Sequence, residues 1–102
     1  MNYINLTPHA IVLNDGRIYE PSGSIARVSS SFSAVVDDVC QQVFGEIQDL
    51  PEPQVGVRLI VSGMVLSALK DTRKDVVAPA TGHPDTQRND KGHIISVPCF
   101  TR

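Results

Sequence analysis

The chain has 102 residues, which corresponds to one small domain, and we treat residues 1–102 as a single unit. It carries 9 Lys and Arg against 11 Asp and Glu, and the resulting formal charge of -2 argues against general binding to nucleic acid or to anionic lipid. Aromatic residues make up 5% and Trp is absent, so few side chains could stack on bases or sugars. A core without disulfides or metal is feasible at this size, and assembly into a homo-oligomer would help to stabilise it.

The N-terminal residues lack the features of a targeting segment. Residues 1–6 mix polar and apolar side chains and run directly into Thr7-Pro8, without a basic start or an apolar stretch. No apolar run approaches the roughly 18 residues that cross a bilayer. We therefore expect a cytoplasmic protein without membrane contact. Cys40 and Cys99 lie far apart and have no CxxC partner, so we interpret them as two buried, reduced thiols.

The first predicted element is an antiparallel hairpin. Two apolar segments, residues 10–13 and 17–20, flank Asn14-Asp15-Gly16. Asp-Gly tolerates positive φ angles and closes tight turns of this kind. A turn at residues 21–23 then leads to a short strand at residues 25–30.

Residues 34–47 fit two interpretations. Their β-branched side chains favour one or two strands with a bend at Asp37-Asp38. The same apolar residues also recur at helical spacing, but the low Ala and Leu content and the interior Gly45 make a helix the less favoured alternative.

A strand, a helix and a second strand are predicted next. Leu50-Pro51-Glu52-Pro53 must be extended, because each Pro disfavours α geometry in the residue before it. It leads into a strand at residues 57–61. Ser62 is a suitable N-cap for a two-turn helix at residues 63–70, and a short strand follows at residues 76–78.

The last quarter of the chain begins with a polar stretch at residues 80–92, which contains two turn signals. Stretches of this length are commonly functional or disordered, and the sequence leaves both open. Residues 93–97 are predicted to form the closing strand, and Pro98 places Cys99 and Phe100 at or beyond a sheet edge.

Together these elements predict a mostly β (α+β) fold. We expect five to seven short antiparallel strands in a small open barrel or sandwich, with one two-turn helix after residue 62. The predicted core comprises the apolar members of the clearest elements: Ile11, Leu13, Ile18, Ile60, Leu66, Leu69, Ile94 and Val97.

Signatures of catalysis and of metal binding are missing. His9, His83 and His93 are not spaced with one another or with Cys as metal ligands usually are. The chain has no GxSxG nucleophile elbow and no GxGxxG or GxxxxGK phosphate loop. An enzyme is therefore the weaker functional class, and we expect no metal and no cofactor.

A binding site for an anion is the more specific hypothesis. Arg73 and Arg88 frame the polar stretch near Thr81, and guanidinium groups bind phosphate or carboxylate through paired hydrogen bonds. Thr7 and His9 belong to the other polar turn that offers both a hydroxyl and an imidazole. We predict that these five residues bind the ligand and that the two segments meet in one pocket, either within one chain or across an oligomer interface.

Both segments also have a purely structural interpretation. The Thr-Pro-His turn could simply connect two strands. The basic residues could be neutralised by the acidic residues interleaved with them, and Arg73 could form an ion pair with Asp75 or Asp71.

A set of segments in this order resembles small proteins of bacteriophages, prophages and actinobacteria. The segments are Asn5-Leu6-Thr7-Pro8-His9-Ala10, Leu50-Pro51-Glu52-Pro53, Ile60-Val61-Ser62-Gly63-Met64-Val65, Arg73-Lys74-Asp75-Val76-Val77-Ala78-Pro79-Ala80-Thr81-Gly82 and Arg88-Asn89-Asp90-Lys91-Gly92. Proteins of that group open with a Leu-Thr-Pro-His turn and carry an Arg-x-Asp-Val-Val-x-Pro-x-Thr-Gly segment. The resemblance spans nearly the whole chain and implies a phage-type accessory protein of unestablished activity, acting in the bacterial host cytoplasm.

The sequence thus leaves three functions open. The first is a non-enzymatic binding module for an anionic, nucleotide-like small molecule, which by analogy with other phage proteins would sequester a signal of host immunity. The second is a protein-interaction module that binds or masks a host protein. The third is an uncharacterised enzyme.

Overall fold

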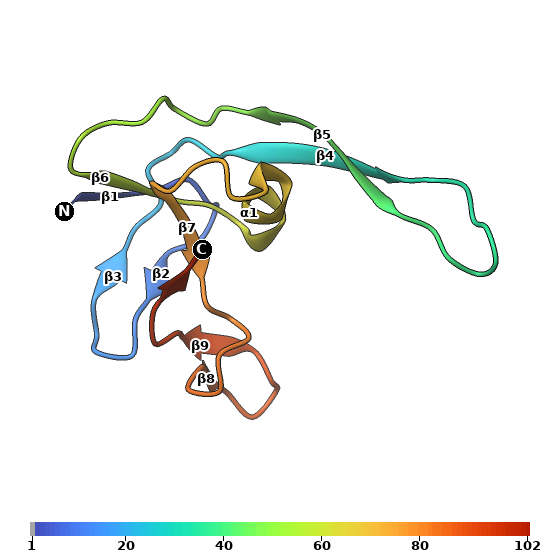
Figure 1. The fold of residues 1–102 in the computed structure, drawn as a ribbon. Helices are drawn as coiled ribbons and strands as arrows, with labels where there is room; N and C mark the ends of the chain where they lie inside the picture. Colours follow the sequence, from blue (N-terminus) through green and yellow to red (C-terminus); the bar gives the residue numbers. More distant parts are fainter. Residues whose placement is uncertain (1) are drawn as a thin grey trace.

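A computed structural model describes residues 2–102, and its strands and one helix surround a small central sheet (Figure 1). The elements in chain order are β1 (Asn2–Asn5), β2 (Ile11–Val12), β3 (Ile18–Tyr19), β4 (Arg27–Phe32), β5 (Gln42–Gln48), β6 (Val57–Ile60), α1 (Gly63–Leu69), β7 (Val76–Pro79), β8 (Gln87–Arg88), β9 (Ile94–Ser96) and β10 (Phe100–Thr101). The mostly β fold class with one short helix is confirmed.

The central sheet has the strand order β1-β6-β7-β10. Its β1–β6 and β6–β7 pairs are parallel and its β7–β10 pair is antiparallel, which corrects the expectation of antiparallel strands throughout. The reason lies in the β6-α1-β7 connection: a strand, a helix and a strand in succession return the chain to the same end of the sheet, so the two strands run in parallel. Three further pairs, β2–β3, β4–β5 and β8–β9, are separate antiparallel hairpins. No described sheet closes into a barrel, and the strands outnumber the expected five to seven because several have only two residues.

The core occupies both faces of the central sheet. Successive side chains of a strand point to opposite faces, so Leu59 and Val61 pack with α1 while Ile60 packs with the β2–β3 hairpin. Val76 and Val77 of β7 divide in the same way. This two-sided burial explains why Leu59, Ile60 and Val61 are apolar in succession rather than in alternation with polar residues.

Helix α1 has the limits that its sequence predicts. The Ser62 side chain accepts a hydrogen bond from the Val65 backbone N–H at 3.3 Å and so caps the first turn. Lys70 ends the helix in the left-handed conformation, with a φ of 50°. Val65 and Leu69 are buried against the sheet.

The predicted hairpin at residues 10–20 is present as β2–β3. Gly16 has a φ of 95°, which favours glycine, and it closes the turn after Leu13. Ile11 and Leu13 are buried as expected. Ile18 is 57% exposed, because its side chain lies on the outer face of a separate two-stranded sheet, which no other element of residues 2–102 covers.

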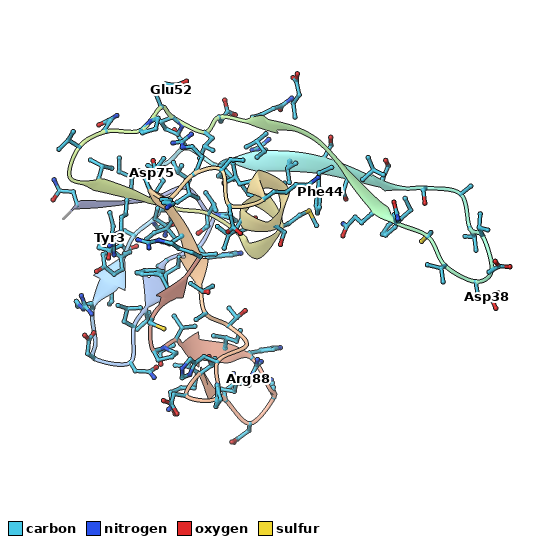
Figure 2. The ribbon with its side chains drawn as sticks, in the orientation of Figure 1. Tyr3, Asp38, Phe44, Glu52, Asp75 and Arg88 are labelled. Carbon is cyan, nitrogen blue, oxygen red and sulfur yellow. The ribbon has the colours of Figure 1, made fainter. Side chains whose placement is uncertain are left out.

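Residues 27–48 form a long hairpin, called the arm below, which extends away from the central sheet beyond α1 (Figure 1). The predicted strand at residues 25–30 corresponds to β4, and the favoured strand interpretation of residues 34–47 corresponds to β5 and the turn before it. The bend falls at Asp37 and Asp38, which have φ angles of 52° and 65°. Figure 2 shows Asp38 at the free end of the arm and Phe44 beside α1. The radius of gyration is 15.1 Å, against about 13 Å for a compact chain of this length, so the arm makes the molecule extended.

The polar stretch at residues 80–92 is part of a small ordered hairpin, β8–β9. Within the predicted core, Ile60, Leu69 and Val97 are buried, Leu66 is half-buried and Ile94 is 43% exposed. Ile94 and its neighbour Ile95 belong to this peripheral hairpin and are both exposed, and burial begins only at Ser96 and Val97. The expectation of buried thiols is wrong: both Cys40 and Cys99 are free and exposed.

Candidate functional site

Thr7 lies in a buried hydrogen-bond network centred on Asn5. The Asn5 side-chain oxygen accepts hydrogen bonds from the Thr7 backbone N–H at 2.9 Å and from its hydroxyl at 2.7 Å. The Asn5 amide nitrogen donates to the backbone carbonyls of His9 at 2.8 Å and Tyr19 at 2.9 Å. Asn5 is 2% exposed and Thr7 is 8% exposed, whereas the His9 side chain is exposed. The network links the turn to β3, which gives Thr7 a structural role.

Arg73 is held in the connection between α1 and β7. Its Nε and Nη2 atoms donate to the two carboxylate oxygens of Asp75, each at 2.9 Å, and Nη2 also donates to the Pro51 carbonyl at 2.9 Å. The guanidinium, through this paired hydrogen bond, lowers the pKa of the Asp75 carboxyl, and Asp75 raises the pKa of Arg73. The structure thus contains the ion pair that the sequence offered as the structural interpretation of Arg73.

The structure brings two pairs of predicted site residues into contact: the Thr7 hydroxyl donates to the His9 carbonyl at 3.0 Å, and Arg88 contacts Thr81. Arg88 donates from Nη1 to the Gly92 carbonyl at 3.0 Å and from Nη2 to the Thr81 carbonyl at 3.3 Å. The first bond lies within the β8–β9 hairpin, and the second ties the hairpin to the chain after β7.

The two segments of the predicted shared pocket do not share a cavity in this structure of a single chain. The cavity beside Thr7 is bordered by β4 and α1 and contains neither Arg73 nor Arg88. The cavity beside Arg73 contains neither Thr7 nor His9. Ligand binding by Thr7, His9, Arg73, Thr81 and Arg88 stays a prediction.

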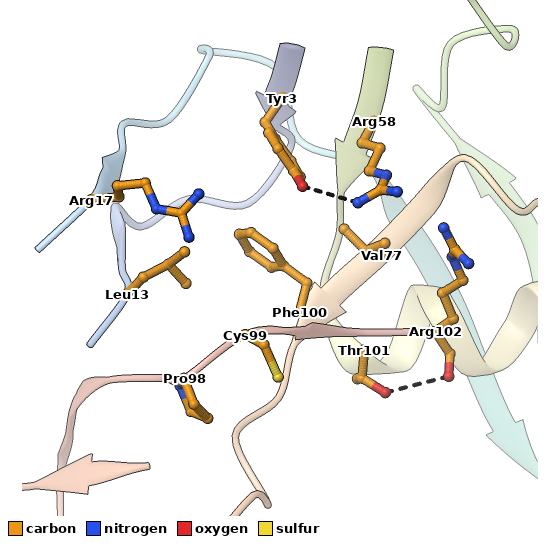
Figure 3. Close-up of a pocket in the computed structure, with 10 residues that line it drawn as sticks. All are labelled: Tyr3, Leu13, Arg17, Arg58, Val77, Pro98, Cys99, Phe100, Thr101 and Arg102. Carbon is orange, nitrogen blue, oxygen red and sulfur yellow. Dashed lines mark hydrogen bonds between the residues drawn. The ribbon is translucent and has the colours of Figure 1, made fainter. Parts of the chain in front are cut away.

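A different cavity, of about 590 Å³, lies against β1, β6, β7 and the last five residues of the chain. We call it the Tyr3 cavity (Figure 3). Tyr3 and Arg58 occupy matching positions of the parallel β1–β6 pair, so their side chains emerge on the same face of the sheet. Phe100 comes from β10 at the sheet edge, and Arg17 and Arg102 complete the charged part of the lining.

Aromatic rings line one wall of the Tyr3 cavity. The ring centroids of Tyr3 and Phe100 are 5.3 Å apart with an interplanar angle of 28°, and Tyr19 packs against both rings at 5.0 and 5.5 Å. This mutual packing restricts the rotamers of the three rings. The cavity therefore contains a preformed aromatic surface.

Arginine side chains lie beside this aromatic surface. Arg58 donates from Nη1 to the Tyr3 hydroxyl at 3.1 Å, and its Cζ atom is 5.9 Å from the Tyr3 ring centroid. Arg17 is paired with Asp15 at 2.8 Å, whereas Arg58 and Arg102 have no carboxylate within 4.0 Å among residues 2–102. In the view of Figure 3, the Phe100 ring lies between Arg17 on one side and Arg58 and Arg102 on the other. The arrangement offers guanidinium donors to an anion and a ring face to an aromatic or apolar group.

None of the residues that the sequence predicts for the binding site lines this cavity. Arg58 belongs to the basic residues of the second half of the chain, but Tyr3 and Phe100 lie at opposite ends of the sequence and come together only through the strand order. The Asn5 network was also missed, although an Asn two residues before a Thr and three before a Pro is a signal for a side-chain-capped turn.

Two further features bear on function. Within the part of the chain that the structure describes, no group of three or more His, Cys, Asp or Glu side chains is arranged to hold a metal ion. Among the same residues, no helix is long and apolar enough to cross a membrane.

No protein-family model, no curated protein and no solved structure matches the chain.

Proposed function

We propose that this protein is a non-enzymatic binding module for an anionic small molecule that carries a ring, and that the ligand binds in the Tyr3 cavity. The observation that supports this function is the juxtaposition of Arg58 and Arg102, which have no carboxylate partner among residues 2–102, with the packed rings of Tyr3 and Phe100. A nucleotide combines the two required chemistries, because its phosphate accepts charge-assisted hydrogen bonds and its base stacks on aromatic rings.

The resemblance to phage proteins adds a biological role to this proposal. A phage-type accessory protein in the bacterial cytoplasm that binds a nucleotide would lower the free concentration of a signal of host immunity. The size of the cavity, about 590 Å³, is within the range of small-molecule sites.

A host-protein interaction is the second candidate function, and the arm favours it. Phe32, Val35, Val36 and Val39 of the arm are each at least 65% exposed. Contiguous exposed apolar side chains of this kind usually mark a protein interface.

Calorimetric titration with three probes tests the proposed ligand class. We expect adenosine 5′-monophosphate to bind more tightly than either inorganic phosphate or adenosine, because only the first supplies both the anion and the ring. A 100-fold excess of the nucleotide over its Kd should raise the free energy of unfolding by about 2.7 kcal/mol.

Variants of two arginines locate the site. Arg58→Ala should weaken binding of adenosine 5′-monophosphate by about 10-fold to 150-fold, corresponding to about 1.5 to 3 kcal/mol for hydrogen bonds to a charged group. Arg27→Ala removes the same side chain from the arm, outside the cavity, and should leave binding unchanged. Equal losses in both variants, or no binding of any of the three probes, would refute the proposal.

A further inference from the structure

The outer part of the arm, residues 32–43, presents an apolar surface to solvent. Phe32, Val35, Val36, Val39 and Val43 are 68%, 70%, 66%, 65% and 49% exposed. They lie in one hairpin, with Val35, Val36 and Val39 around the turn and Phe32 and Val43 on opposite faces, whereas single exposed apolar residues are normally scattered over a surface. This cluster is therefore the feature of the arm that requires a partner.

The backbone of the arm is equally open. β4 and β5 form a two-stranded sheet, and no third strand among residues 2–102 pairs with either edge. Val36 and Val39 exchange backbone hydrogen bonds of 2.8 and 3.0 Å around the turn at Asp37-Asp38, so pairing continues to the tip. An isolated two-stranded hairpin is marginally stable in water, and its free edges are templates for a further strand.

We propose that the occupant of this surface is a second copy of the chain, and that two arms pair antiparallel about a two-fold axis. A strand that pairs antiparallel with its own copy is self-complementary, because one rotation places each residue and its partner in equivalent positions. The paired arms join one free edge of each hairpin into a four-stranded sheet and bring exposed apolar side chains of the two copies into contact as cross-strand neighbours. The dimer is independent of the Tyr3 cavity, which lies on the central sheet.

The distribution of charge on the arm fits this arrangement. The tip is acidic, with Asp37 and Asp38, while Lys70 at the end of α1 lines the groove beside the middle of the arm, at Gln41–Phe44. When two arms run antiparallel and overlap in their outer parts, the tip of one arm lies at the middle of the other. Asp37 and Asp38 of each copy then face Lys70 of the second copy, whereas a tip-to-tip contact would place four carboxylates together.

The oligomeric state of the full chain tests the interface. Light scattering and sedimentation velocity over a range of chain concentrations should give a dimer for the wild type. The double variant Val36→Asn, Val39→Asn should raise the dimer Kd by about 10-fold or more, because both copies lose the cross-strand apolar contacts of two valines. Val55→Asn is the matched control: Val55 is fully exposed and outside the arm, so its replacement should leave the dimer intact.

A charge exchange tests the antiparallel arrangement. Asp38→Lys should raise the dimer Kd by about twofold to fivefold, the range of an exposed ion pair, and adding Lys70→Glu to the same chain should restore it. Circular dichroism melts confirm that each variant folds. The proposal is overturned by a wild-type monomer at all concentrations, by a dimer that survives the double valine variant, by equal disruption from Val55→Asn, or by failure of Lys70→Glu to restore the dimer.

Discussion

Replacing Arg73 with Ala should destabilise the fold. The change removes three hydrogen bonds of 2.9 Å, two to the Asp75 carboxylate and one to the Pro51 carbonyl. The bond to Pro51 connects the segment before β7 with the extended segment after β5. The Arg73 and Asp75 side chains retain 20% and 18% of their exposure, so water replaces part of what is lost.

We therefore expect Arg73→Ala to lower the free energy of unfolding by about 2 kcal/mol. This lies within the usual range of about 1.5 to 3 kcal/mol for one hydrogen bond to a charged group, and the three bonds are not expected to add. For a domain of this size, about 2 kcal/mol lowers the Tm by about 8 to 16 °C. Urea unfolding followed by circular dichroism measures the free energy, and a thermal melt measures the Tm.

The chain supplies a matched control in Arg17. Its ion pair with Asp15 has side chains that are 63% and 55% exposed, so Arg17→Ala should lower the free energy of unfolding much less than Arg73→Ala does. Binding of adenosine 5′-monophosphate should be unchanged in folded Arg73→Ala. The structural role of Arg73 would be refuted if Arg73→Ala lowered the free energy of unfolding no more than Arg17→Ala does. A large loss of nucleotide affinity in Arg73→Ala would instead support the prediction that Arg73 binds the ligand.

The remaining predictions concern stability at other positions. Arg73 lowers the pKa of Asp75 in the folded state, so the stabilisation from the ionised Asp75 is present above its unfolded pKa of about 3.9 and is lost as the pH falls through the folded pKa. Urea unfolding between neutral and acidic pH should show a steeper decrease in the free energy of unfolding for the wild type than for Asp75→Asn. Equal decreases in the two proteins would contradict this prediction. Asn5→Ala leaves the carbonyls that its amide bonds unpaired and should cost about 1 to 3 kcal/mol or more, measured by the same unfolding assay. Leu69→Ala should cost about 2 to 5 kcal/mol because Leu69 is buried, whereas Ile18→Ala should cost less than about 1 kcal/mol because Ile18 is exposed. Equal Tm values for the two variants in thermal melts would show that burial has been assigned wrongly.

Local signals in the sequence were sufficient for several elements. The Asp15-Gly16 turn, the Ser62 N-cap and the bend at Asp37-Asp38 depend on side chains and φ preferences of a few neighbouring residues. The strand interpretation of residues 34–47 was favoured for the same reason, because β-branched side chains suit an extended backbone. These features do not depend on what the rest of the chain does.

The candidate site depends on distant parts of the chain. Tyr3, Arg58 and Phe100 come together because β1, β6, β7 and β10 are neighbours in that order, and no local pattern encodes strand order. Arg73 illustrates the same point for the predicted site, because the sequence offered both a ligand contact and an ion pair, and the structure contains the ion pair.

The sequence by itself determined the mostly β class, the helix after Ser62 and the hairpin turns, because propensity, capping and turn chemistry act over a few residues. Only the tertiary structure decided the parallel pairing of β6 with β7, the exposure of Ile18 and Cys99, and the projection of the arm. Those properties depend on which surfaces meet, and an apolar residue becomes buried only when another element covers the face of the strand on which it lies.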